Sequence, residues 1–330
     1  MSRLRFYAMR SVKTVFILWF ILTMLFFGFR LMPGDFTDYL VYSGASEEAA
    51  QAIAEQWGLH KPLYVQYWDY LTKFVTLDAG TSVQAREPVW DFVKLKLFNT
   101  LILAIPAITL AYVVAGILGS YIGDKRGTPI EKAVITGVTF IGAFPGFFIG
   151  IVFIIVFAVW LDLFPTGGMI GSETVRTYQD AAWWRIYFTR DFAWHYLLPF
   201  MTILARATFS PTLLMRTSFV EIKELDFVHY QKVTGLPYTR RLRHLSKHAI
   251  LPLITLYPIS LLQTVSGLVL IEFVFNRPGI GWTLVQAITF RDVPVVMFVF
   301  FLAAATVVIA NFVVDILYGV IDPRISVEEH

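Results

Sequence analysis

The sequence predicts an all-α polytopic membrane protein with six transmembrane helices, and three observations support this prediction. Of the 330 residues, 57% are hydrophobic and only 15% are charged, whereas soluble domains usually have about 45–50% apolar and about 25% charged residues. The mean hydropathy is +0.64, and several long runs contain no Asp, Glu, Lys or Arg. This balance argues against a water-soluble enzyme, and it excludes intrinsic disorder, which needs few apolar and many charged residues.

Six apolar stretches are candidates for membrane-spanning helices, because a helix needs about 20 mostly apolar residues to cross the hydrocarbon core. Five of them are free of Asp, Glu, Lys and Arg, and the fourth in chain order contains one such residue, Arg206. The predicted spans are Thr14–Phe29, Leu97–Gly123, Ala133–Leu161, Phe192–Met215, Ala249–Ile271 and Val293–Val314.

The first stretch shares a basic leading segment with signal peptides, since residues 3–13 contain four Lys or Arg residues. Its apolar run is long for a signal peptide, and no small-residue cleavage site follows it. The bulky residues 27–30 stand there instead. We therefore interpret this stretch as a retained anchor rather than a cleaved signal.

The distribution of Lys and Arg predicts the orientation, because these residues are enriched in short cytoplasmic loops. With both termini inside, the inner segments contain the basic N-terminus, three bases in residues 125–132 and seven in residues 216–247. The outer segments are longer and less dense in bases. The sequence thus predicts that both termini lie on the cytoplasmic side.

The segment after the first span, residues 33–96, is too long for a turn and is predicted to form short helices. Ser46 is a plausible N-cap of one helix and Gly58 its end. Pro62 suits the first turn of a second helix, in which apolar and aromatic residues recur at helical spacing. The residues at this spacing are Tyr64, Tyr67, Trp68, Leu71 and Phe74. We expect the aromatic ones among them to pack at the membrane interface rather than to stack on a ligand.

Two later outer segments are also predicted. Residues 162–194 hold four aromatic residues within positions 183–188, for which interfacial packing is again the simplest interpretation. Residues 272–294 contain the run Asn276–Gly281, whose Pro and Gly content predicts irregular backbone.

The largest cytoplasmic segment, residues 218–248, is too short for a catalytic domain. It mixes acids, bases and apolar residues, and its helical part ends at Gly235-Leu236-Pro237. Two interpretations remain open: a solvated connector, or a helix that docks onto a cytoplasmic protein.

Sequence motifs for catalysis are missing from this chain. There is no phosphate-binding G-x-x-x-x-G-K-[ST] loop, no H-E-x-x-H zinc motif and no G-x-S-x-G nucleophile elbow. The chain has no cysteine, and its six histidines do not cluster at ligand spacing. We therefore predict no catalytic residue, no metal site and no cofactor in this chain.

A single formal charge lies well inside a predicted span, that of Arg206. Placing it in the membrane centre costs about 2.5–3.5 kcal/mol on insertion scales, so it faces either a substrate path or a neighbouring helix. Ion-driven carriers usually keep carboxylates or broken helices at mid-membrane. The driving force for transport is therefore expected to come from another protein.

The cytoplasmic segment resembles the coupling loop of ABC importer permeases of the oligopeptide/dipeptide/nickel family. Glu221 is followed by the run Asp226–Leu236, which is similar to the family pattern D-Y-V-R-T-A-R-A-K-G-L, and by His248–Pro252, similar to H-A-x-x-N-A-L-x-P.

Other segments resemble the same family in order along the chain. The run Gly58–Tyr67 is similar to the pattern G-L-x-x-P-x-x-x-Q-Y, and Pro165–Gly168 to P-x-x-G. The run Glu272–Gly281 is similar to E-x-x-F-x-x-P-G-[IL]-G, and Asn311–Arg324 to N-x-x-x-D-x-x-Y-x-x-x-D-P-R. Such an importer contains two homologous permeases. The six spans and the long first outer segment of this chain resemble the B-type permease of the two.

The resemblance implies a transmembrane subunit in the cell membrane of a prokaryote, with a homologous second permease, two ABC ATPases, an extracytoplasmic solute-binding protein and membrane lipids as partners. It implies no nucleic acid partner, and it assigns ATP and Mg to the ATPases. The expected cargo is oligopeptides or dipeptides, with oligosaccharides or nickel as alternatives. Two alternative functions of a different class stay open: an ion-coupled secondary transporter and a membrane enzyme.

The resemblance also implies site residues. The ATPase-coupling residues are expected to be Glu221, Asp226, Phe227, Lys232, Gly235, Leu236 and Pro252. The coupling helix is expected to extend from Asp226 to Gly235, with Glu221 capping it or pairing with a base, and Pro252 is expected in the first turn of the fifth span. Polar positions of the later spans are expected to line the translocation path, although they would equally serve as hydrogen-bonding contacts between helices: Arg206, Gln263, Ser266 and Glu272. The predicted parts of the chain are residues 1–32 (tail and first span), 33–96 (outer segment), 97–324 (five-helix core with coupling loop 218–248) and 325–330 (tail).

Overall fold

The computed structural model describes residues 3–30, 46–48, 51, 55, 58 and 60–321. The described residues form helices and no named strand, which confirms the all-α prediction. They divide into two compact units, residues 1–99 with 279–330 and residues 100–278. The division falls inside helix α5 (Val89–Asp124), between Asn99 and Thr100.

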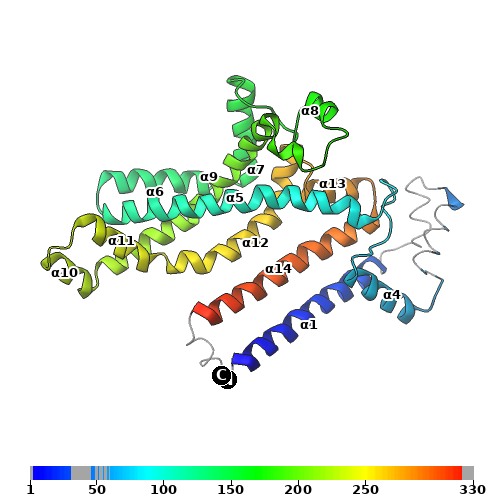
Figure 1. The fold of residues 1–330 in the computed structure, drawn as a ribbon, viewed down its shortest axis with the longest axis horizontal. Helices are drawn as coiled ribbons and strands as arrows, with labels where there is room; N and C mark the ends of the chain where they lie inside the picture. The colour runs from blue at the N-terminus through cyan, green and yellow to red at the C-terminus, as the bar shows by residue number, and fades with distance from the viewer. Residues whose placement is uncertain are drawn as a thin grey trace. The chain divides into compact units, whose positions relative to one another are not determined.

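The first unit contains α1 (Arg3–Arg30), α4 (Leu63–Val75), the start of α5, α13 (Ile280–Thr289) and α14 (Val293–Ile321). The N-terminal α1 and the C-terminal α14 lie side by side (Figure 1). Their core is rich in aromatic rings, which pack edge to face or tilted. Its central members are Phe26, Tyr70, Phe74, Phe298 and Phe301.

The second predicted outer helix is confirmed as α4. Its Gln66, Tyr70 and Phe74 are buried at i, i+4, i+8 spacing, while Tyr64 and Trp68 are exposed. The Tyr67 hydroxyl lies 2.6 Å from the Thr23 hydroxyl of α1, so α4 is attached to the first span. The first predicted outer helix, with its proposed N-cap Ser46, falls mostly outside the described residues.

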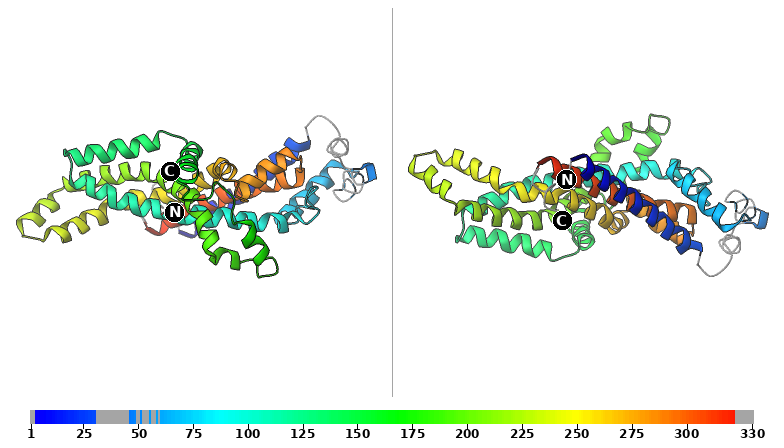
Figure 2. Two further views of the ribbon diagram at one scale, coloured as in Figure 1. Left: turned by 90° about the horizontal axis from the view of Figure 1, so that it is seen from above. Right: turned by 90° about the horizontal axis from the view of Figure 1, so that it is seen from below.

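The second unit contains the rest of α5, then α6 (Pro129–Gly142), α7 (Gly146–Phe153), the π-helix η1 (Ile154–Trp160) and two short helices, α8 (Ser172–Thr177) and η2 (Arg185–Phe188). The long α9 (Arg190–Lys223) follows, then α10 (Asp226–Val233), α11 (Tyr238–Ala249) and α12 (Leu251–Val274). The pair α10–α11 lies at one end of this unit and α8 toward the other (Figures 1 and 2).

Three described helices are long and apolar enough to cross a membrane by themselves: α1 within Ala8–Arg30, α5 and α9. The pair α6 and α7–η1 meets the same criterion only together. Shorter apolar stretches lie at Leu251–Leu261, Ile280–Thr289 and Val293–Ile309. The chain is thus a multi-pass membrane protein, while the count of six spans and the orientation stay predictions.

The predicted third span, Ala133–Leu161, differs from the structure because it is broken. Helix α6 ends at Gly142, and the following helix leaves at an angle of 98°. Pro145 stands at the N-cap of α7 with φ −60° and ψ 144°. Proline has no N–H to continue the helical hydrogen bonds, and it disfavours helical backbone at the residue before it. Hydropathy alone does not show this break, because Ala143 and Phe144 are as apolar as the helices.

The region of residues 272–294 is more regular than predicted. Irregular backbone occurs in the first part, where Asn276 has φ +45° and Gly279 is extended, and again in the turn after residue 289, where Arg291 has φ +57°. Helix α13 then occupies Ile280–Thr289. The Pro-Gly pair therefore marks the start of a helix rather than a long irregular loop.

Candidate functional site

The predicted coupling loop folds as two short helices after α9. Leu225 has extended backbone and precedes the eight-residue α10, which begins at Asp226 as predicted. A second helix, α11, follows from Tyr238 to Ala249, which the sequence prediction did not include. Only Ile250 separates α11 from α12, so the two-helix loop is joined to long apolar helices at both ends.

Gly235 ends α10 in the way the sequence predicted. Its φ is +72°, in the left-handed region that residues with a Cβ rarely adopt. The Leu236 N–H donates to the Gln231 carbonyl (3.1 Å) and the Gly235 N–H to the Lys232 carbonyl (3.2 Å). These two bonds form a Schellman motif, and Pro237 then prevents continuation of the helix. The exit direction of the chain from α10 is therefore fixed locally.

A buried apolar cluster joins the loop to the long helices. Val228 of α10 and Leu245 of α11 are almost fully buried, together with Phe219 of α9 and Leu253 of α12. Because four helices share this cluster, a displacement of α10 is transmitted to α9 and α12 by direct packing. Its remaining buried members are Met215 and Ala249.

Helix α5 packs closely against α9, one of the four helices that share this cluster. A Cβ at Gly119 would lie 2.5 Å from the Met215 Cβ and 2.8 Å from the Thr212 carbonyl oxygen. Only a residue without a side chain fits at that position, so the backbones of α5 and α9 approach closely there.

Hydrogen bonds tie the ends of α5, α9 and α11 together. The Lys223 ammonium donates to the carbonyl (2.7 Å) and the carboxylate (3.0 Å) of Asp124. The Tyr238 hydroxyl donates to the other carboxylate oxygen of Asp124 (2.6 Å). This bond raises the pKa of the Tyr238 phenol above its ordinary value, because ionisation of the phenol would remove the donor beside a carboxylate.

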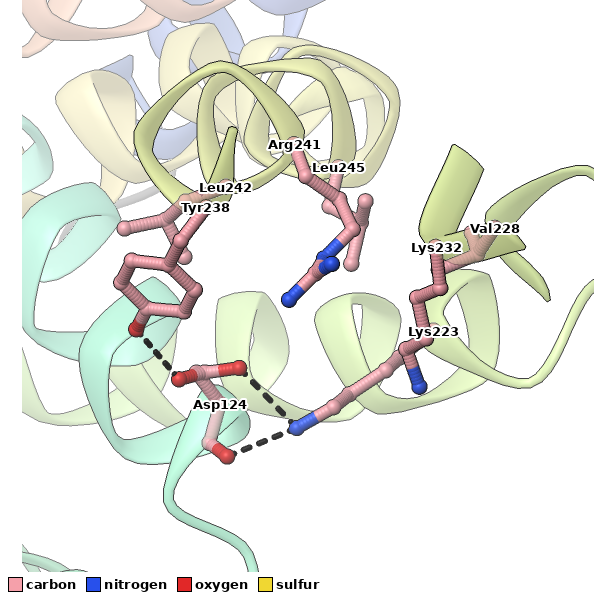
Figure 3. A pocket seen from close by; sticks show the side chains of 8 residues that line it. All are labelled: Asp124, Lys223, Val228, Lys232, Tyr238, Arg241, Leu242 and Leu245. Carbon is pink, nitrogen blue, oxygen red and sulfur yellow. Dashed lines mark hydrogen bonds and ion pairs between the residues drawn. The ribbon is translucent and has the colours of Figure 1, made fainter. Parts of the chain in front are cut away.

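A pocket of about 190 Å³ lies between these helix ends (Figure 3). Its charged lining residues are Asp124 of α5, Lys223 of α9, Lys232 of α10 and Arg241 of α11. Its apolar lining is Val228, Leu242 and Leu245, and Tyr238 completes it. Arg241 lies over the Tyr238 ring, with 5.7 Å between the guanidinium carbon and the ring centroid.

The predicted coupling residues lie on the loop and its two junctions. Glu221 is exposed in the last turn of α9, and Asp226 is exposed at the start of α10. The Phe227 ring is partly exposed and packs edge-on against His248. Leu236 is half-buried after the Schellman turn, and Pro252 occupies the first turn of α12, as predicted.

Sequence reasoning assigned Glu221 a capping or pairing role. In the described part of the chain Glu221 forms no ion pair, and its neighbour Glu224 pairs with Arg126 instead. The missed residues of this region are Asp124, Tyr238 and Arg241. The sequence gives little indication that they meet, because Asp124 lies more than 90 positions before its hydrogen-bond partners.

The four predicted path residues do not share one environment. Arg206 and Gln263 are exposed on α9 and α12. Glu272 is fully buried, and its carboxylate accepts a hydrogen bond from the Thr100 hydroxyl. Ser266 lies on α12, and its side chain is outside the described residues.

Two runs that resemble family patterns, Pro165–Gly168 and the run that begins at Glu272, meet at the other end of the second unit. The Gly168 N–H donates to the Phe275 carbonyl (2.7 Å), and a Cβ at Gly167 would lie 2.6 Å from that oxygen. Beside them Arg277 is fully buried, between the rings of Phe192 and Tyr196. Its three side-chain nitrogens have no hydrogen-bond partner among the described residues.

Comparisons with known proteins agree with this architecture. Residues 115–327 match the family described as "Binding-protein-dependent transport system inner membrane component", and residues 3–104 match the N-terminal part of such components. The chain is 30% identical over 320 residues to the oligopeptide transport system permease protein AppB of Bacillus subtilis (strain 168), covering 96% of this chain and 98% of AppB.

It is also 29% identical over 312 residues to the glutathione transport system permease protein GsiC of Escherichia coli (strain K12), covering 93% of this chain and 94% of GsiC. The matches extend along nearly the whole chain and include both the predicted coupling loop and the long apolar helices. The chain therefore belongs to the family of binding-protein-dependent transport system inner membrane components, the permeases of ABC importers.

Proposed function

We propose that this chain forms, together with a homologous second permease, a path for oligopeptides or dipeptides across the cell membrane of a prokaryote. An extracytoplasmic binding protein delivers the peptide, and two partner ATPases bind ATP and Mg and hydrolyse the nucleotide. This chain contributes neither a catalytic group nor a cofactor. Membrane lipids surround it, and nucleic acid has no part in the process.

The anchoring of α10 is the observation that supports this function best. An ATPase that closes on ATP has to move membrane helices through a short and stiff connection. Helix α10 is bounded by the end of α9 on one side and by a Schellman turn on the other. Val228 fixes it to a core that also contains residues of α9, α11 and α12. The exposed Asp226 and Tyr230 leave the opposite side of α10 open to a partner.

The peptide cargo is proposed from the relatives, because AppB and GsiC are named for oligopeptide and glutathione transport, and glutathione is itself a short peptide. Arg206 and Gln263 support a polar path, since both are exposed on apolar helices. A membrane-exposed arginine is costly, and a water-filled path shared with the second permease removes that cost. Glu272 is buried and accepts a hydrogen bond from Thr100, which supports a role in packing between helices rather than on the surface of this path.

The coupling role is tested in the complete complex, reconstituted in liposomes with its second permease, ATPases and binding protein. We expect Glu221→Lys, Asp226→Lys and Gly235→Trp to abolish peptide-stimulated ATP hydrolysis and peptide uptake while membrane insertion stays normal. Glu173→Lys is the matched charge control, because Glu173 is exposed on α8. If all three loop variants keep full peptide-stimulated ATP hydrolysis, α10 is not the coupling element.

The cargo is tested by uptake assays in the same liposomes. We expect ATP-dependent uptake of labelled dipeptides or oligopeptides. Uptake of an oligosaccharide or of nickel with no peptide uptake would assign the chain to another branch of the family. Transport by this chain alone under an ion gradient would contradict the proposal.

A further inference from the structure

The pocket between α10 and α11 has the composition of an anion site. Its volume of about 190 Å³ corresponds to about six water molecules at roughly 30 Å³ each, which is enough for a phosphate group. It is lined by three cationic side chains and one carboxylate, those of Lys223, Lys232 and Arg241 and of Asp124. Three positive charges and one negative charge leave a net +2.

Both oxygens of the carboxylate in the pocket already have a hydrogen-bond donor. One oxygen of Asp124 accepts from Lys223 and the other from Tyr238. Lys232 and Arg241 form no ion pair or side-chain hydrogen bond with any residue that the structure describes. Figure 3 shows Arg241 reaching from α11 into the space between Tyr238 and Lys232. Two cations on different helices therefore face one pocket without a counter-charge.

The geometry favours a phosphate group as that counter-charge. A guanidinium donates two parallel hydrogen bonds to a phosphate, and a lysine ammonium adds a mobile point charge. Stacking on Tyr238 holds the Arg241 side chain in place before a ligand arrives. A phosphate group with one ester bond carries a charge of about −1.5 to −2 near pH 7, and the phosphodiester of a lipid headgroup carries one negative charge, so the net +2 of the lining attracts either.

The location admits two sources of phosphate. Asp124 and Lys223 are the last residues of α5 and α9, two helices long enough to cross a membrane. Basic pockets at the ends of such helices bind anionic lipid headgroups, and free phosphate has access to the same pocket. We propose that this pocket binds a phosphate-bearing anion that bridges Lys232 of α10 to Arg241 of α11.

The consequence for transport rests on the proposed function. Without an anion, Lys232 and Arg241 repel each other across the turn at Gly235. A bound phosphate replaces this repulsion by two attractive contacts and makes the α10–α11 pair stiffer. Anion binding then increases the efficiency with which movement of α10 is passed to α9 and α12.

Binding is measured on the full chain in its complex, without ATP. The complex is placed in nanodiscs of phosphatidylcholine alone or with phosphatidylglycerol, and retained phosphatidylglycerol is counted by native mass spectrometry. The affinity for inorganic phosphate is measured in the phosphatidylcholine discs by the shift in thermal unfolding, against chloride at equal ionic strength. The test variant is Lys232→Gln with Arg241→Gln.

The control variant Arg243→Gln with Lys247→Gln removes two charges of the same sign from exposed positions of α11 outside the pocket. A second variant, Lys232→Arg with Arg241→Lys, changes the same two positions but keeps both positive charges, and it therefore distinguishes loss of charge from misfolding. We expect the test variant to weaken binding on the order of tenfold or more, while the control and the charge-keeping variant retain it.

The binding signal that the test variant loses identifies the source of the phosphate group. Loss of retained phosphatidylglycerol identifies the lipid, and loss of the phosphate-dependent stabilisation identifies the free anion. Equal binding in wild type, test and control variants overturns the proposal. Because these measurements need neither ATP nor peptide, a wild-type complex that binds the anion but does not transport peptides would refute only the proposed function.

Discussion

Arg216 of α9 and Glu131 of α6 form an ion pair in which the Nε and Nη2 atoms of the arginine lie 2.8 and 2.5 Å from one carboxylate oxygen. The other oxygen of Glu131 accepts from the Gly127 N–H (2.6 Å), and the Thr128 hydroxyl caps the same helix. The sequence Thr128-Pro-Ile-Glu131 is a capping box in composition. One carboxylate thus both stabilises the start of α6 and fixes α9 next to it.

Removal of Arg216 is expected to destabilise the second unit. Glu131 has only 6% of its side chain exposed, so Arg216→Ala leaves a buried carboxylate without its counter-charge. We expect a loss of about 2–3 kcal/mol in the free energy of unfolding, below the range for fully buried pairs because Arg216 is partly exposed. The measurement is an unfolding titration with dodecyl sulfate in mixed micelles.

The matched control for this prediction is Arg126→Ala. Its partner Glu224 and Arg126 itself are both more than half exposed, and such pairs contribute about 0–1 kcal/mol. Equal losses for the two variants would show that burial of Glu131 has no influence on the pair.

Gly119 is predicted to be required for the close approach of α5 and α9. In Gly119→Ala the new Cβ would lie 2.5 Å from the Met215 Cβ, so the helices have to separate. Overpacking costs about 1–3 kcal/mol, and the higher helix propensity of alanine offsets about 1 kcal/mol. We expect a net loss of up to about 2 kcal/mol in the same unfolding titration.

Gly116→Ala is the control on the same helix. Its Cβ would lie 3.9 Å from the nearest atom, in Leu253, which is an ordinary contact. This variant is expected to keep or raise the free energy of unfolding by up to about 1 kcal/mol. Destabilisation of both variants to the same degree would rule out a specific contact at Gly119.

Asp292 is predicted to anchor the start of α14 in the first unit. Its buried carboxylate accepts from the Ser82 hydroxyl and from the Gln84 N–H, and it lies 3.5 Å from the Val295 N–H of the first turn. Loss of a helix cap and of buried hydrogen bonds predicts that Asp292→Ala costs about 2–3 kcal/mol. Thermal unfolding in detergent micelles measures this change.

Asp78→Ala serves as the control in the same unit, because Asp78 is exposed and the one described hydrogen bond of its side chain, from the Gly80 N–H, is 3.4 Å long. The expected change is within about 0.5 kcal/mol. A result for Asp292→Ala as small as this would contradict the anchoring role.

Tyr238 is predicted to make stability depend on alkaline pH. Its hydrogen bond to Asp124 raises the pKa of the folded phenol above the unfolded value. The contribution of this bond is therefore fully present below the unfolded pKa and is lost as the pH rises through the higher folded pKa. The free energy of unfolding measured across alkaline pH is expected to show a decrease that is smaller in Tyr238→Phe.

Tyr230→Phe is the control, since the Tyr230 ring is exposed on α10 and its hydroxyl has no hydrogen bond among the described residues. This variant is expected to keep the wild-type pH profile. If the free energy of unfolding decreases at alkaline pH to the same extent in Tyr238→Phe as in the wild type, the decrease arises from other groups.

Much of this protein was predictable from local sequence. The apolar runs predicted the long helices, and the aromatic periodicity predicted α4. The start of α10 at Asp226, its end at Gly235 and the place of Pro252 in the first turn of α12 were also predicted. These features depend on residues within one or two helical turns, where hydrophobic burial, capping and backbone conformation act directly.

The sequence by itself determined that the chain is helical, membrane-embedded and equipped with a short helix of defined ends. Only the tertiary structure decided that the third apolar run bends by 98° at Pro145, that α1 packs against α14, and that Lys223, Asp124 and Tyr238 meet beside a pocket. The physical reason is distance along the chain. Contacts between residues about 100 positions apart depend on which helix faces pack together, and no local pattern of hydropathy or charge contains that information.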